Sequence, residues 1–95
     1  MKVIQVKQRR AVVSVVGQDQ VGIIAKVTTV LAENHVNILD ISQTILQDFF
    51  TMMMIVDVSN QDIEALQKQL SIIGQSIGLN ISIQMEEIFQ TMHRV

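Results

Sequence analysis

Two short segments of the sequence carry residue types that could bind a ligand. The first, Gly17 to Gly22 (G-Q-D-Q-V-G), follows an apolar run and leads into a helical pattern, and the second, Asn37 to Asp40 (N-I-L-D), opens the next apolar stretch. Backbone N–H groups at a helix start suit a carboxylate. Asp19 and Asn37 add an acceptor and an amide that could hold an ammonium and a carboxylate. A small zwitterion would satisfy this set.

The same residues also have a purely structural interpretation. Gly22 lacks a Cβ atom, which allows a ligand or a neighbouring chain to approach closely, but it could equally ease the turn. Asp19 stands where the N-cap of a helix belongs, and Asn37 could simply fix the start of a strand. Residue chemistry alone leaves both interpretations open.

Enzymatic chemistry finds little support in the remaining polar residues. The sequence has no HExxH motif, nucleophile elbow or Walker loop. An acylphosphatase-like enzyme would need an arginine beside a phosphate cradle, yet Arg9 and Arg10 precede the first apolar run instead of following it. His35 falls in a helix-to-strand turn and His93 near the C-terminus. We therefore expect no catalytic residues.

Metal and cofactor sites are also not expected. The sequence has no cysteine, and Met52, Met53 and Met54 are neighbours that would alternate between the faces of a strand. Glu86 and Glu87 would diverge in the same way and are expected at the N-terminus of a helix.

Length and charge limit the remaining classes. Ninety-five residues suffice for a single domain. A net charge of −2 and only three aromatic residues argue against nucleic acid as a partner. The sequence shows neither a signal-peptide pattern nor an apolar run long enough to cross a membrane, so we expect a cytoplasmic protein without a membrane partner.

Hydrophobic periodicity predicts the first half of the chain. Residues 11–16 form a buried strand, and an amphipathic helix with Asp19 as its N-cap follows and stops at Asn34 and His35. Its expected core positions are Ile23, Ile24, Val27, Val30 and Leu31. A strand over Asn37 to Leu46 should place Leu39, Ile41 and Ile45 on one face, and Gln47-Asp48 should form the hairpin turn.

The second half continues with a strand over Phe49 to Ser59, which is apolar on both faces. The face with Phe49, Met53 and Ile55 should be covered by a terminal helix or by another subunit. Ser59 and Asn60 are expected to cap a second helix that ends at Gly78, with Gly74 in close packing or weakening the helix. A strand over Leu79 to Met85 and a short helix over 86–94 complete the chain.

This order of elements predicts an α+β, ferredoxin-like βαββαβ sandwich in a single domain over residues 1–95. Its core, residues 10–86, would contain a four-stranded antiparallel sheet with two helices on one face, plus the short C-terminal helix. We expect this fold to bring the Gly17–Gly22 turn and the Asn37 strand start together.

The first half of this pattern resembles the ACT domain family. The stretch V-V-S-V-V-G-Q-D-Q-V-G-I-I-A-K-V-T-T-V-L-A-E-N-H-V-N-I-L-D-I-S is similar to the first βαβ of that family, whose usual pattern has D-x-P-G-[IL] and later G-x-N-I. The match continues through the remaining elements in their order and so covers nearly the whole chain. It is greatest to free-standing ACT proteins and to the ACT modules of the glycine cleavage system repressor and formyltetrahydrofolate deformylase.

The resemblance implies a regulatory domain that senses an amino acid or another small ligand and pairs side by side, with the ligand at the subunit interface. Carried over, the ligand contacts fall on Asp19, Gly22 and Asn37, with backbone groups near Gln18 and Ile23 as helpers. Two positions depart from the family pattern, since Val21 replaces its proline and His35 replaces a glycine.

The leading hypothesis is therefore a regulatory module, not an enzyme, that binds an amino acid as a homodimer or higher even oligomer and acts on a regulated protein. A ligand-free protein interaction domain is the alternative, and an acylphosphatase-like enzyme is a remote third.

Overall fold

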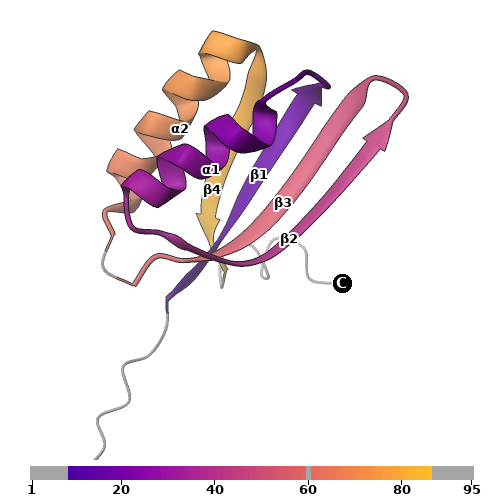
Figure 1. Ribbon diagram of the computed structural model, residues 1–95. Helices are drawn as coiled ribbons and strands as arrows, with labels where there is room; N and C mark the ends of the chain where they lie inside the picture. Colours follow the sequence, from indigo (N-terminus) through magenta and orange to yellow (C-terminus); the bar gives the residue numbers. More distant parts are fainter. Residues whose placement is uncertain (1–8, 60, 87–95) are drawn as a thin grey trace, which may run out of the picture.

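The computed structural model describes residues 9–59 and 61–86. The chain runs through six elements in the order expected from the sequence (Figure 1). They are β1 (Arg10–Gln18), α1 (Ile23–Glu33), β2 (Asn37–Leu46), β3 (Phe49–Asp57), α2 (Ile63–Ile77) and β4 (Leu79–Met85). The helix expected over 86–94 lies, beyond Glu86, outside the described residues.

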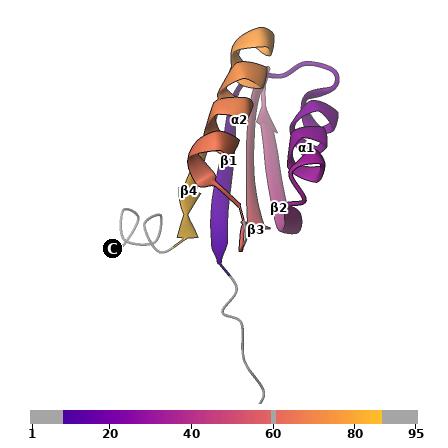
Figure 2. The ribbon, with the colours of Figure 1, turned by 90° about the vertical axis from the view of Figure 1, so that its left-hand side faces the viewer.

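The four strands form one antiparallel sheet in the order β2-β3-β1-β4. Both helices lie on the same face of this sheet (Figures 1 and 2). The opposite face, called here the open face, has no described helix over it. The predicted ferredoxin-like fold is confirmed.

Strand β3 divides its residues between the two faces as its alternation predicts. Phe50, Met52, Met54, Val56 and the following Val58 are all buried on the helix side. Phe49 and Met53 instead lie on the open face and remain exposed. The open face of β3 is therefore apolar but not covered within the described residues.

Strand β2 is the outer strand of the sheet and departs from simple alternation. A bulge at Leu39 shifts its register, so that Ile38 pairs with Val56 and Asp40 pairs with Ile55. Leu39 has no partner on β3, so the predicted common face stays a prediction for this residue. Ile41 and Ile45 do share the helix face, yet 45% and 51% of their surface is exposed.

Helix α1 begins later than the sequence predicted. Gly22 occupies its N-cap position with φ of 88°, a left-handed conformation that favours glycine. Asp19 lies three residues earlier and is not the cap, which corrects the prediction. Ile24 is partly exposed although its spacing placed it in the core. The helix ends at Asn34 as expected, but the left-handed residue is His35, with φ of 57°.

Helix α2 is capped by Asp62, whose Oδ1 accepts hydrogen bonds from the N–H groups of Glu64 at 3.0 Å and Ala65 at 3.3 Å. The prediction of a Ser59 cap is wrong, because the Ser59 hydroxyl donates to Asp57 instead. Asn60 lies outside the described residues.

The glycine inside α2 marks a close contact with the sheet. Gly74 is buried, and a Cβ atom there would lie 2.6 Å from the carbonyl oxygen of Leu79. Close packing, one of the two expectations for Gly74, is therefore confirmed. Gly78 ends the helix in a left-handed conformation, as predicted.

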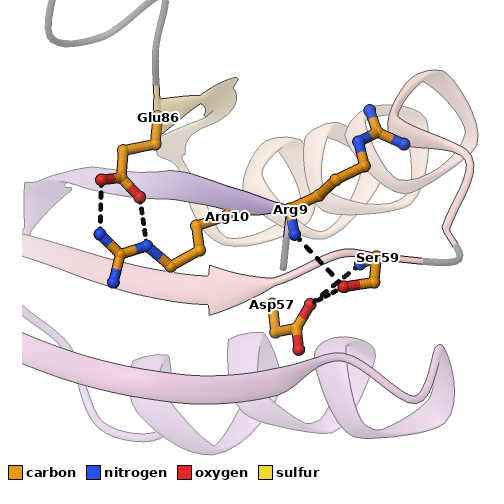
Figure 3. A network of polar contacts seen from close by, with 5 residues as sticks. All are labelled: Arg9, Arg10, Asp57, Ser59 and Glu86. Atoms are coloured by element: carbon orange, nitrogen blue, oxygen red, sulfur yellow. Dashed lines mark hydrogen bonds and ion pairs between the residues drawn. The ribbon is translucent and has the colours of Figure 1, made fainter. Parts of the chain in front are cut away.

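Polar contacts at the start of β1 connect three strands (Figure 3). The Arg10 guanidinium donates two hydrogen bonds to the Glu86 carboxylate, through Nε and, at 2.5 Å, through Nη2. These hydrogen bonds and the opposite charge lower the pKa of Glu86 and raise that of Arg10. On the other side, the Arg9 N–H donates to the Ser59 hydroxyl at 3.3 Å. The ends of β1, β3 and β4 are thereby joined.

Replacing Asp62 with alanine tests the corrected helix cap. Loss of the side-chain acceptor should lower the free energy of unfolding by about 0.5–2 kcal/mol. Asp19→Ala is the matched control, and it should change stability by less than about 0.5 kcal/mol because Asp19 caps no helix. Urea denaturation of both variants measures the difference. A larger loss for Asp19→Ala than for Asp62→Ala would contradict the assignment.

The Arg10–Glu86 pair predicts a pH-dependent contribution to stability. Since the folded state lowers the pKa of Glu86, the pair stabilises the fold above the ordinary value of 4.5 and loses this effect as the pH falls below it. Glu86→Gln should therefore have a lower melting temperature than the native chain near neutral pH, and the difference should vanish in acid.

Thermal unfolding across this pH range is the measurement. Glu33→Gln, at an exposed position that ends α1, is the control for removing one carboxylate. A Glu86→Gln effect that is equally large in acid would show that the ion pair is not its source.

Candidate functional site

The turn between β1 and α1 is fixed from two sides. The Asp19 backbone N–H donates to the carbonyl oxygen of Asp48, in the β2–β3 hairpin, at 2.7 Å. The Gln20 side-chain amide donates to the carbonyl oxygen of Ile77, at the end of α2, at 2.6 Å. The turn is therefore hydrogen-bonded both to the hairpin and to the end of α2.

The start of α1 keeps the features that the sequence proposed for ligand binding. Gly22 brings the chain into the helix, and a Cβ atom there would meet no other atom within 4 Å. Its positive φ, and not lack of space, is therefore what favours glycine. The N–H groups of the first helical turn, which begins at Ile23, have no acceptor within an α-helix. They are suited to an anionic group such as a carboxylate.

A shallow hollow lies beside this turn, where the end of β1 meets the hairpin. Gln18, Leu46, Gln47, Asp48 and Phe49 line it, and its volume is about 380 Å³. The lining combines two side-chain amides, a carboxylate and two exposed apolar side chains. Gln18, predicted from the family resemblance as a helper, is thus at a hollow together with hairpin residues that the sequence did not select.

Asn37 lies at the opposite end of the sheet from this turn. It pairs with Asp57, which pairs on its other side with Arg10, the first residue of β1. Gln18, the last residue of β1, pairs with Phe49. The nine residues of β1 therefore separate the two segments by about 27 Å at 3.4 Å per residue.

The expectation that one chain brings Asn37 and the turn together is therefore wrong. Helix α1 runs back along the sheet, so β2 must start at the end where β1 started. The direction in which each element runs was therefore sufficient to predict the end of the sheet at which Asn37 lies. The same signal could have identified Asp48, because an antiparallel β3 must begin beside the end of β1.

The open face of the sheet has a second hollow of about 240 Å³. Val12, Met53 and Ile55 supply apolar lining, and Asp40, Ser42 and Glu86 supply polar groups. It involves none of the predicted site residues. Arg9 and Arg10 lie at the start of β1, far from the turn, so the residues considered for an acylphosphatase-like site do not converge with it.

Residues 9–59 and 61–86 contain neither a metal-binding cluster nor a membrane-spanning helix. In this part of the chain, no three His, Cys, Asp or Glu side chains are grouped so that they could hold a metal ion. Neither described helix is long and apolar enough to span a bilayer.

Relatives of known sequence match almost the full length of the chain. A UPF0237 protein of Methanocaldococcus jannaschii is 51% identical over 88 residues, which cover 90% of this chain and 98% of the relative. Among solved structures, an ACT domain protein from Streptococcus pneumoniae is 40% identical with a TM-score of 0.78, covering 88% of this chain and 97% of that one.

More distant structures share the fold. A putative glycine cleavage system transcriptional repressor superposes with a TM-score of 0.74 at 24% identity, over 82% of this chain and 46% of its own. A formyltetrahydrofolate deformylase from Pseudomonas syringae pv. tomato superposes with a TM-score of 0.76 at 20% identity, over 83% and 28%. These confirm the resemblance noted in the sequence. The family model described as the ACT domain matches residues 9–84, and the chain belongs to the ACT domain family.

Proposed function

We propose that this chain is a regulatory module, not an enzyme, that binds an amino acid or a similar small zwitterion between two identical copies. The observation that carries the proposal is the exposed outer strand β2, whose two ends lie beside the two separated halves of the predicted site. One end begins with Asn37, and the other leads into the hairpin that holds Asp19.

Pairing of β2 with itself about a twofold axis would bring these halves together. If Ser42 of one copy lies opposite Ser42 of the other, antiparallel pairing extends in both directions to the strand ends. The bulge at Leu39 adds one residue to the strand and shifts the pairing beyond it by one position. Ile45 of one copy then comes opposite Ile38 of the second copy, and Leu46 comes opposite Asn37 of the second copy. Paired residues then share a face, as an antiparallel sheet requires.

This arrangement supplies a composite site at each end of the paired strands. The turn of one copy contributes the N–H groups near Ile23 and the carboxylate of Asp19, and the second copy contributes the amide of Asn37. These groups complement the carboxylate and the ammonium of a zwitterion. Gln18 and Gly22 would complete the wall beside the ligand.

The edge of β2 also has the character of an interface. A long outer strand with free hydrogen-bonding groups is a template for pairing with another chain. Ile41 and Ile45 are half exposed on the helix face, and complete burial would contribute on the order of 1.5–3 kcal/mol per side chain.

A ligand-free interaction domain is the second candidate. It is favoured by the apolar side chains that β3 exposes on the open face, Phe49 and Met53. This candidate also allows β2 pairing but predicts no binding of amino acids. A regulated partner protein fits either candidate.

The dimer prediction concerns Ile45. Ile45→Lys places a charge on the proposed interface and should weaken self-association at least 100-fold, as measured by sedimentation equilibrium. The control is Ile72→Lys, on an exposed position of α2 with 66% of its surface accessible, which should leave association unchanged. Native chain that stays monomeric at high micromolar concentration, or equal effects of the two variants, would rule out the β2 interface.

Calorimetry with the twenty amino acids tests whether the chain binds an amino acid. At least one should bind the native chain, and Asn37→Ala should weaken it about 10-fold or more, because a hydrogen bond to a charged group is lost. Asn80→Ala, at an exposed asparagine of β4, should have no effect. Binding of no amino acid would favour the ligand-free interaction domain.

A mixture of two variants shows whether the site is shared between copies. Asp19→Ala and Asn37→Ala chains should each bind poorly alone. In a mixed dimer, one of the two sites receives the native Asp19 and the native Asn37, so mixing should restore up to a quarter of the native number of sites. No restoration would place the ligand within a single chain.

A further inference from the structure

The hollow on the open face is a second candidate site, separate from the turn. Its floor comes from the paired strands β1 and β3, where Val12, which is only 5% exposed, lies directly opposite Ile55. Met53, on the same face, is 37% exposed. A floor of this kind contacts alkyl groups and offers them no hydrogen-bond donors or acceptors.

The bulge in β2 supplies the charge at the rim. Because Leu39 is an extra residue in the register, Asp40 comes opposite Ile55 on the open face. The Ile41 backbone N–H donates to the Asp40 Oδ1 at 2.8 Å and orients the carboxylate. Bulges commonly re-aim a side chain in this way. Ser42 adds a hydroxyl on the same side.

The two carboxylates at this hollow differ in their partners. Glu86 is bound by Arg10, so its charge is already balanced. Within residues 9–59 and 61–86, no lysine or arginine forms an ion pair with Asp40. The hollow therefore has an apolar floor and one rim carboxylate whose charge is not balanced by a cation of the described chain.

Size restricts the ligand further. The hollow has a volume of about 240 Å³ and is open on one side. A short unbranched alkyl chain with one polar end fits a space of this size.

We propose that the open-face hollow binds a free primary alkylamine in its protonated form. The alkyl chain lies on Met53 and Ile55, and the ammonium group donates hydrogen bonds to Asp40 and Ser42. The proposal uses none of the residues of the amino-acid site, but Asp40 and Ser42 lie on β2, the strand that would pair with itself in the proposed dimer.

Three ligands of the same chain length distinguish binding through charge from binding through apolar contact alone. Hexylamine, 1-hexanol and hexanoate are titrated into the full chain while the methyl signals of Met53 and Ile55 are followed by NMR. Hexylammonium should shift both signals and bind about tenfold more tightly than hexanol, and hexanoate should not bind, since a charged hydrogen bond favours only the cation.

A matched pair of variants tests the role of the carboxylate. Asp40→Asn should reduce hexylamine affinity to that of hexanol, whereas Glu33→Gln, which removes an exposed carboxylate at the end of α1, should leave it unchanged. Thermal unfolding confirms that both variants fold.

Several outcomes would overturn the proposal. Equal affinities for hexylamine and hexanol in the native chain would mean non-specific apolar binding, and preferred binding of hexanoate would assign the site to Arg10. Nuclear Overhauser contacts from Met53 to residues 87–95, or to a second copy, without a response to any probe would assign the hollow to the protein itself.

Discussion

The pairing of β1 with β3 in one register is the constraint on which the rest of the structure depends. Val13 lies opposite Met54 and Val15 opposite Met52, and all four side chains are buried under the helices. A slip of one residue would turn this set toward the open face, so burial selects a single register. That register places the end of β1 against the start of β3, and therefore places the turn beside the hairpin. It also places Val12 against Ile55, which creates the apolar floor on the other face.

The fold was largely predictable because its strongest signals are repeated along the chain. The alternation through β3 and the three- and four-residue steps of α2 each specify an element over several positions, so one misplaced residue does not change the result. The glycine at position 78 ended α2 as predicted because its left-handed conformation is one that few other residues adopt easily.

The predictions that were wrong depend on single residues or on long-range geometry. Several residues near each helix start have side chains able to cap, and only the three-dimensional path of the chain selects Asp62 over Ser59 and excludes Asp19. The bulge at Leu39 has no local signature in the sequence N-I-L-D. The site residues were chosen by type, which identifies donors and acceptors but not the end of the sheet at which they lie. Asn37 and Asp19 were therefore both plausible and yet about 27 Å apart along the sheet.

The two edge strands of the sheet differ in length, and this difference affects how copies of the chain could assemble. β2 offers ten residues at one edge, while β4 offers seven at the other. If β2 of each molecule joined β4 of the next, every addition would leave a new free edge, and the result would be an open filament. Self-pairing of β2 consumes the longer edge of both molecules in one step and leaves only the shorter strands outside. In the proposed twofold arrangement, the β2 contact would be used up within each pair of molecules and would not by itself propagate into a filament.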